Sequence, residues 1–257
     1  MSKKLKHARN NLQIEYDIIY NILPYLHYLD RINFKITSKY YNSYYKKYKF
    51  YKKINLIYVI DTTASMIDPI ENIIDDLFNI NKYFYYLNVN YNLIEFNDHI
   101  ITDNNIIDNP TIVHKNIKNL KQFNKILKNM EIDNGGDLPE AIADGLHEAN
   151  KLNLDYKKAN IIIFISDAYP HGIDKSNDRF PNGCPCSINY KNQLKKINEK
   201  NIKFIFYDLK NDNDTESDTE SNIEKNYNQF KKEALKLSNG ILLSGFDNIK
   251  KFILSHI

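Results

Sequence analysis

Two uninterrupted apolar runs constrain the fold of this chain more than any other feature of its sequence. Leu56–Ile60 ends directly before Asp61, and Ile161–Ile165 ends directly before Ser166 and Asp167. Strands that are buried on both faces of a parallel sheet have this composition, because helices cover both faces of such a sheet. We therefore predict strands at both runs. Further strands are predicted at 89–96, 204–209 and 241–243, with a short edge strand around Ile112 and Val113.

Amphipathic helical patterns alternate with these apolar runs. Apolar residues recur at helical spacing along one stripe at 70–84, and further helices are expected at 120–130, 139–150, 190–200, 224–237 and 248–256. Pro139 would occupy the first turn of its helix, where a missing N–H costs least. Strands that alternate with helices predict an α/β fold with a doubly wound, mostly parallel sheet and helices on both faces.

Charge divides the chain into two parts. Residues 1–54 hold 12 Lys and Arg against 3 Asp and Glu, a balance of +9, so the remainder carries −6 of the total +3. We predict a small helical module with a basic tail at 1–52 and the α/β domain at 54–257. The basic charges are scattered along a helix-like pattern, which favours a solvated helical face over nucleic-acid binding. The segment 211–222 is acidic, lacks apolar residues and is predicted to be a disordered loop.

The bulk composition suggests a cytoplasmic protein. No apolar run approaches the roughly 18 residues that a membrane span requires, and no apolar segment follows the N-terminal charges as in a signal peptide. The two cysteines, Cys184 and Cys186, are too few for a disulfide framework. We expect no membrane partner and a location in the cytoplasm, or in the host cytoplasm if the source is a virus.

Oxygen-bearing side chains follow the predicted strands at the edge where parallel strands end. The candidate ligands are Asp61, Thr63 and Ser65 after the first strand, Asp137 and Glu140 before a helix, and Asp167 after the most apolar strand. Loops at the carboxyl ends of such strands meet in one crevice. Carboxylates and hydroxyls are ligands for hard cations, so the pattern predicts a site for Mg²⁺, Mn²⁺ or Ca²⁺. The alternative is that Asp61 and Thr63 cap the following helix and that Asp167 caps a turn.

This pattern resembles the metal-ion-dependent adhesion site (MIDAS) of von Willebrand factor A domains. Asp61-Thr62-Thr63-Ala64-Ser65 matches the Asp-x-Thr/Ser-x-Ser motif, Asp167 matches the distal aspartate of that site, and the order of elements matches over 54–257. The loop 135–141, Gly-Gly-Asp-Leu-Pro-Glu-Ala, departs from the common version, which has a threonine there, and is similar to the Asp-x-Pro-Glu stretch of integrin β subunits. Either Asp137 or Glu140 is then the ligand, or each serves a different ion.

Two further segments are most similar to the A domains attached to α-kinases. They are residues 166–172, Ser-Asp-Ala-Tyr-Pro-His-Gly, and residues 180–186, Phe-Pro-Asn-Gly-Cys-Pro-Cys. The Cys-Pro-Cys is half of a zinc site by spacing, but the chain has no second pair and only His171 lies near in sequence. We favour a structural loop for the cysteines and loop packing for His171.

The N-terminal module resembles an F-box. The matching segments include Asp17-Ile18-Ile19, Ile22-Leu23, Tyr25-Leu26 and Phe34-Lys35, although Ile14-Glu15 replaces the opening Leu-Pro. The resemblance implies that an apolar surface docks on the Skp adaptor of an SCF ubiquitin ligase, through Ile14, Ile18, Ile19, Ile22, Leu23, Leu26 and Phe34. The alternative is a helical extension that packs on the A domain.

Together the two resemblances imply a non-enzymatic substrate receptor. The A domain would capture a client protein whose acidic side chain completes the coordination of the cation, and the F-box-like module would link that client to the ligase. A cation-dependent adhesion or scaffold protein is the alternative. A phosphatase with Asp61 as nucleophile is the remote one, because that chemistry commonly uses a second aspartate two residues later, where this chain has Thr63.

Overall fold

The computed structural model describes most of the predicted α/β domain. The described residues are 54–84, 89–99, 101–102, 105–106, 109–117, 119–132, 135–155, 158–209 and 221–256. The F-box-like residues 1–52, and residues 211–220 of the acidic segment, lie outside this part of the chain, so the predictions made for them remain predictions.

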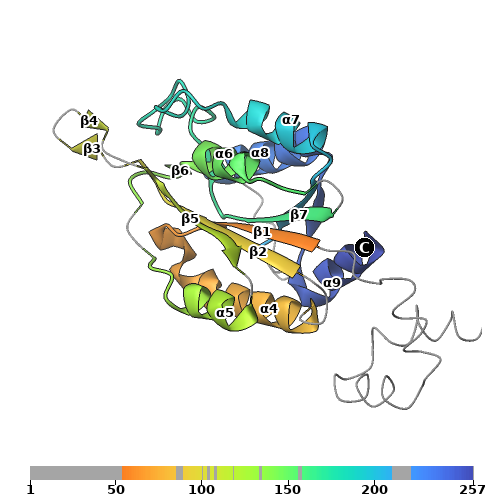
Figure 1. The fold of residues 1–257 in the computed structure, drawn as a ribbon. Helices are drawn as coiled ribbons and strands as arrows, with labels where there is room; N and C mark the ends of the chain where they lie inside the picture. The colour runs from red at the N-terminus through yellow and green to blue at the C-terminus, as the bar shows by residue number, and fades with distance from the viewer. Residues whose placement is uncertain are drawn as a thin grey trace, which may run out of the picture. The chain divides into compact units, whose positions relative to one another are not determined.

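A six-stranded sheet in the order β10-β9-β7-β1-β2-β5 forms the centre of the domain (Figure 1). Neighbouring strands run parallel, except that β5 pairs antiparallel with β2 at one edge. The strands are β1 Ile54–Asp61, β2 Val89–Phe96, β5 Thr111–Ile117, β7 Ala159–Ile165, β9 Lys203–Tyr207 and β10 Ile241–Leu243. The predicted mostly parallel sheet is confirmed.

Helices cover both faces of the sheet, as predicted (Figure 1). One face packs against α4 (Ile67–Phe84), α5 (Leu120–Lys128) and α9 (Gly245–Ser255), whose apolar residues form one buried cluster with it. The other face packs against α6 (Ile142–Lys151), α7 (Tyr190–Glu199) and α8 (Asn222–Ser238), which form a second cluster. The fold is therefore a three-layer α/β domain.

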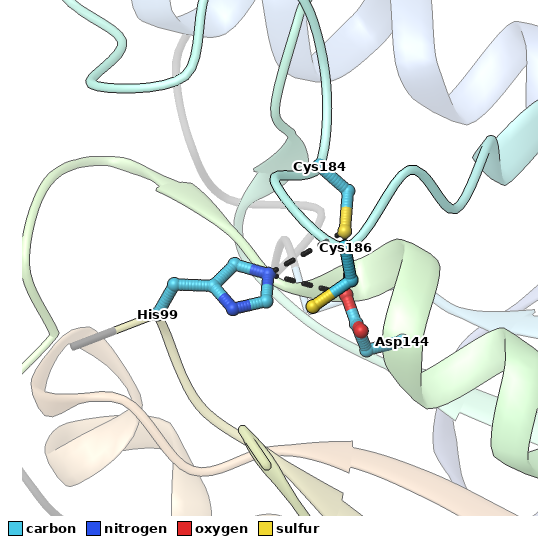
Figure 2. Close-up of side chains that lie close together, drawn as sticks. All are labelled: His99, Asp144, Cys184 and Cys186. Atoms are coloured by element: carbon cyan, nitrogen blue, oxygen red, sulfur yellow. Dashed lines mark hydrogen bonds and ion pairs between the residues drawn. The ribbon is translucent and has the colours of Figure 1, made fainter. Parts of the chain in front are cut away.

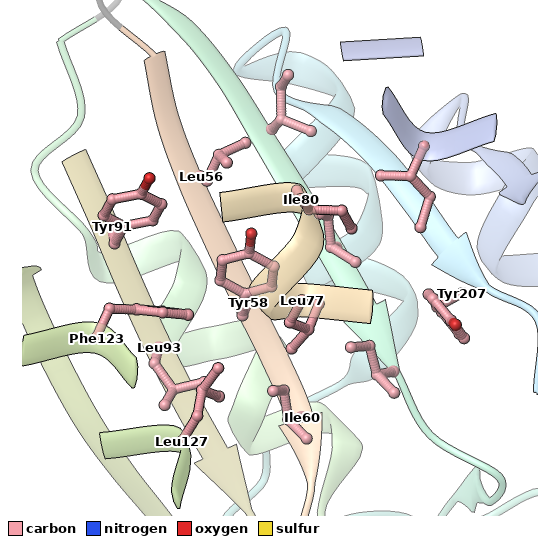
Figure 3. Close-up of a cluster of buried hydrophobic side chains, with 14 of the residues drawn as sticks. Leu56, Tyr58, Ile60, Leu77, Ile80, Tyr91, Leu93, Phe123, Leu127 and Tyr207 are labelled. Carbon is pink, nitrogen blue, oxygen red and sulfur yellow. The ribbon is translucent and has the colours of Figure 1, made fainter. Parts of the chain in front are cut away.

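Strand β1 shows why an uninterrupted apolar run was needed. Leu56, Tyr58 and Ile60 contribute to the first cluster, whereas Ile57 and Val59 contribute to the second, and all five side chains are fully buried. Figure 3 shows the first cluster, in which β1 and β2 side chains meet those of α4 and α5. Burying such a side chain stabilises the fold by about 1.5–3 kcal/mol, so β1 is a principal source of core stability.

The predicted helix at 139–150 begins later than expected. Pro139 and Glu140 form the short strand β6, which pairs in parallel with β8 (Tyr169–Pro170), and α6 starts only at Ile142. Proline is compatible with a helix start but does not require one, and here pairing with a distant segment keeps the chain extended. The prediction of Pro139 in a first helical turn was wrong.

Smaller differences concern the ends of elements. The edge strand β5 is longer than predicted, β9 ends at Tyr207, and α9 begins at Gly245. Ser221 caps α8 by accepting a hydrogen bond from the Glu224 N–H at 3.2 Å, so the last two residues of the segment 211–222 are a cap and a first helical residue. Two two-residue strands, β3 (Ile101–Thr102) and β4 (Asn105–Ile106), pair with each other.

Among the helices of the described residues, none combines the length and the apolar composition that a membrane span requires.

Candidate metal centre

The predicted oxygen-rich site begins at the aligned ends of two neighbouring strands. Ile60 of β1 lies opposite Ile165 of β7, so Asp61 and the loop that begins with Ser166 leave the sheet at the same level. Thr63 and Ser65 follow Asp61 on a tight turn that includes the 3-10 helix η3 (Ala64–Met66). The sheet register thereby brings two of the three predicted loops together.

Asp61 is the hydrogen-bonded centre of this arrangement. Its Oδ1 accepts from the backbone N–H of Thr63 at 3.0 Å and from the Thr63 hydroxyl at 2.7 Å. Its Oδ2 accepts from the hydroxyl of Ser166 at 2.7 Å. The side chain is fully buried, and burial raises the pKa of Asp61 from 3.8 to about 6.

Two hydroxyls join Asp61 to Asp167. Ser65 Oγ donates to Asp167 Oδ1 at 3.0 Å and lies 3.2 Å from Thr63 Oγ1. Each hydroxyl has one proton, and the protons of Thr63 and Ser65 are directed to the two carboxylates. The adjacent hydroxyl oxygens therefore turn lone pairs toward each other, which is the arrangement that a cation stabilises.

Glu140 completes the acidic group from the third loop. Its side chain approaches Thr63 across Gly135, where an added Cβ would lie 2.9 Å from Glu140 Oε1 and 3.3 Å from Thr63 Cβ. Its Oε2 is buried and has no hydrogen-bond partner within the described residues. Burial, followed by the charges of Asp61 and Asp98, raises the pKa of Glu140 to about 11.

These carboxylates lack a protein cation. None of the ion pairs formed within the described residues involves Asp61, Glu140 or Asp167. Burial also raises the pKa of Asp167. A buried group of acids is stable when a cation neutralises it, and carboxylate and hydroxyl oxygens fit a hard divalent ion. The donor set of the predicted site is thus suited to the ion expected for it.

Asp137 is directed differently from Glu140. Its Oδ2 accepts from the backbone N–H of Arg179 at 2.7 Å, and its own N–H donates to Asp98 Oδ2 at 3.3 Å. Its Oδ1 has no hydrogen-bond partner in the described part of the chain and lies 3.9 Å from Arg179 Nε. Glu140 is therefore the acid of this loop that approaches Thr63, while Asp137 lies next to Asp98.

His171 organises a network beside this site. Its Nδ1 lies 2.8 Å from Asp178 Oδ1 and its Nε2 lies 3.0 Å from Asp98 Oδ1, and all three side chains are almost completely buried. Burial by itself would lower the pKa of His171, but the hydrogen bonds that the ring makes to Asp98 and Asp178 outweigh it and hold the pKa above its usual value. Asp98 also accepts from the N–H of Gly136 at 3.0 Å, so the network holds the loop that carries Glu140.

Sequence reasoning missed part of this arrangement. His171 links two acids, Asp98 and Asp178. A different histidine, His99, lies beside Cys184, with its Nε2 at 3.5 Å from the Cys184 Sγ. His171 is the histidine nearest to the cysteines along the chain, but His99 is the one that contacts Cys184 in space. Asp98 and His99 follow β2 at its carboxyl end. Applying the strand-end rule to this second strand would have found both residues.

Comparisons with known proteins agree with this fold. Residues 55–179 match the family model described as von Willebrand factor A domain. No curated protein matches the chain.

Several solved structures resemble the domain weakly. A conserved hypothetical protein, BatB from Bacteroides thetaiotaomicron, is 14% identical, with 79% of this chain and 96% of that chain covered and a TM-score of 0.47. Proximal thread matrix protein 1 from the mussel byssus is 12% identical over 79% of this chain and 44% of that chain, with a TM-score of 0.47. The pilus adhesin SpaC from Lactobacillus rhamnosus GG is 14% identical over 79% of this chain and 29% of that chain, with a TM-score of 0.48.

The chain spans less than half the length of the mussel protein and of the adhesin. The acids Asp61, Glu140 and Asp167 and the strands β2, β5 and β7 lie within the matched residues, whereas β9 and β10 lie beyond them. The fold and the family match together support a von Willebrand factor A domain at residues 55–179.

Proposed function

We propose that this chain is a cation-dependent protein-binding module, and that it is not an enzyme. Asp61, Thr63, Ser65 and Asp167, with Glu140 from the third loop, would hold one divalent cation such as Mg²⁺, Mn²⁺ or Ca²⁺. A bound cation of this kind supplies positive charge and an open coordination position for an acidic side chain of a partner protein. This is the adhesion site (MIDAS) that the sequence motif implies.

The observation that carries this proposal is a buried acidic group without a protein cation. Asp61 and Glu140 are almost fully buried, and Glu140 Oε2 has no partner within the described residues. Ser65 and Thr63 direct their lone pairs toward each other between Asp61 and Asp167. Neutral hydroxyls add oxygen ligands without adding negative charge, which leaves a bound ion able to accept a further carboxylate.

Glu140 is favoured over Asp137 as the acid of the third loop. Glu140 lies against Thr63, whereas one Asp137 oxygen is already used by the Arg179 N–H. The other Asp137 oxygen has no hydrogen-bond partner among the residues described, but Arg179 Nε pairs with it at 3.9 Å, so a protein cation already faces Asp137.

Titration of the full chain with Mg²⁺, Mn²⁺ and Ca²⁺ in a calorimeter tests the proposal. We expect saturable binding of at least one of these ions and an affinity about tenfold weaker in Ser65→Ala, since one oxygen ligand is lost. Ser255→Ala is the matched control, because Ser255 is an exposed hydroxyl on α9. Absence of saturable binding in the wild type, or equal affinities in the two variants, would overturn the assignment.

The aspartate-nucleophile alternative is disfavoured by the residue two positions after Asp61. Thr63 stands where that chemistry commonly uses a second aspartate as acid and base, and its hydroxyl donates to Asp61 Oδ1 at 2.7 Å. Turnover of a generic phosphoester with Mg²⁺, lost in Asp61→Asn, would contradict a non-enzymatic role.

We further propose that the chain is a substrate receptor of an SCF-type ubiquitin ligase in the cytoplasm. This part depends on the F-box-like sequence of residues 1–52 alone, and a cation-dependent adhesion or scaffold protein is its alternative. The substitution pair Ile18→Asp and Leu26→Asp is expected to abolish capture of a purified Skp-type adaptor, because charges replace the apolar docking residues.

Asp61→Asn is the control for adaptor capture, and it should retain adaptor binding while its cation binding is weakened. If the wild-type chain fails to capture the adaptor, the scaffold alternative replaces the ligase role. The cation proposal is unaffected by that result, because it rests on different residues.

A further inference from the structure

A second group of metal-ligand side chains lies apart from the oxygen-rich site. It consists of His99, Asp144, Cys184 and Cys186, whose ligand atoms all lie within 4.8 Å of one another (Figure 2). His99 follows β2, Asp144 lies on α6, and the cysteines lie on the segment between β8 and α7. Three separate parts of the chain thus converge on one point.

The spacing of these atoms fits a tetrahedral zinc site. His99 Nε2 lies 3.2 Å from Asp144 Oδ2 and 3.5 Å from Cys184 Sγ, and Cys184 Sγ lies 3.0 Å from Asp144 Oδ2. Zinc–ligand bonds of about 2.0–2.3 Å in a tetrahedron separate the ligand atoms by roughly 3.3–3.8 Å. Small outward movements of the side chains would therefore admit the ion.

The ligand chemistry selects a different metal from that of the first site. Two thiols, one imidazole and one carboxylate favour zinc over Mg²⁺ or Ca²⁺, because sulfur and nitrogen are softer donors than oxygen. Nε2 is the nitrogen of His99 that faces the cysteines, as Figure 2 shows. The ring is fully buried and its Nε2 faces both Asp144 and Cys184, so Nε2 is the atom available to a metal.

The segment around the cysteines supplies an independent argument. Residues 171–189 connect β8 to α7 without any helix or strand, although all of them belong to the described part of the chain. A connection of this length without secondary structure is uncommon in a compact domain unless side chains or a ligand hold it. The network of His171 and Asp178 holds its first part, and Cys184 and Cys186 lie in its second part.

We propose that His99, Asp144, Cys184 and Cys186 bind a zinc ion that ties the segment 171–189 to the end of β2 and to α6. Binding transfers the Cys184 and Cys186 thiol protons to solvent, and no oxidation or reduction takes place. Because His99 directly follows Asp98, the zinc ion would also hold the network that positions the Glu140 loop. Its role is structural, and it is independent of any partner that the oxygen-rich site binds.

Zinc content and cobalt spectroscopy of the full chain, purified under reducing conditions, test this proposal. We expect about one zinc ion per chain in the wild type. Replacement by Co²⁺ should give the visible and near-ultraviolet bands of a tetrahedral cobalt–thiolate site. Cys186→Ser should weaken zinc binding by more than the roughly 10–100-fold that loss of an outer-shell partner costs.

Two matched variants make the test specific. Cys186 is exposed, so its replacement should leave the domain folded. His147→Gln is the control for His99→Gln, because His147 lies on α6 but outside the cluster. Asp61→Asn should retain the zinc ion. The proposal is overturned by a wild-type chain without zinc or cobalt–thiolate bands, by unchanged zinc affinity in Cys186→Ser, or by a Cys184–Cys186 disulfide that persists in protein purified under reducing conditions.

Discussion

Asp61→Asn is expected to weaken Mg²⁺ binding by about 30-fold to several thousand-fold, the largest effect of any single substitution on that site. Loss of one member of a buried charge pair costs about 2–5 kcal/mol, and about 1.4 kcal/mol corresponds to a tenfold change in affinity. Asp61 is fully buried at the centre of the acidic group, so solvent cannot replace its charge. Calorimetric titration of the variant with Mg²⁺ measures the change.

The asparagine side chain is chosen because it keeps the shape of the site. Its carbonyl oxygen still accepts from the Thr63 N–H and hydroxyl, and the Ser166 hydroxyl rotates to accept from the new amide. Asp75→Asn is the charge-matched control, since Asp75 is exposed on α4. Wild-type affinity in Asp61→Asn, or an equal loss in Asp75→Asn, would remove Asp61 from the metal centre.

Glu140→Gln is expected to stabilise the ion-free protein by as much as about 3 kcal/mol at pH 7. The wild-type carboxyl is buried among other acids with one oxygen unpartnered, and its pKa is raised from 4.5 to about 11. Between pH 4.5 and about pH 11 the folded protein binds more protons than the unfolded chain. The contribution of Glu140 to the free energy of unfolding therefore decreases as pH rises through this range. Glutamine has no proton to gain and avoids this loss.

Urea unfolding in the presence of EDTA measures this effect. The variant should exceed the wild type by about 1 kcal/mol at pH 5 and by up to about 5 kcal/mol at pH 8, because the raised pKa of Glu140 penalises the wild type more at high pH. Added Mg²⁺ should stabilise the wild type more than the variant, since binding favours the folded state.

Glu148→Gln controls for the loss of one acid. Glu148 is a partly exposed residue of α6 that pairs with Lys151, so its replacement should change stability by less than about 0.5 kcal/mol. If Glu140→Gln is no more stable than the wild type, or if the difference does not vary with pH, then Glu140 is not buried among uncompensated acids.

The predictions for Asp61 and Glu140 depend on residues of which the sequence alone revealed some and left others open. Asp61 and Asp167 were found because both follow uninterrupted apolar runs, and β1 and β7 do lie side by side in the sheet. Their proximity follows from the parallel sheet, in which neighbouring strands end at the same edge. The family resemblance pointed to the same residues.

Other parts of the site were not predictable in this way. The choice between Asp137 and Glu140 stayed open because the two acids are three residues apart on one loop. The pairing of β6 with β8 and the hydrogen bonds of Asp98 and Arg179 orient that loop, so that Glu140 meets Thr63. The same pairing delayed the start of α6, which local helical periodicity could not indicate.

The sequence by itself indicated the six strands of the central sheet, most of the helices and the oxygen-bearing side chains that follow the strands, because periodicity and strand ends are local properties of the chain. Tertiary structure alone decided which side chains from distant loops became neighbours. His99 and Cys184 are 85 residues apart, and no spacing along the chain connects them. Their contact exists because β2, α6 and the segment 171–189 pack at one end of the sheet, which brings together groups that no local pattern relates.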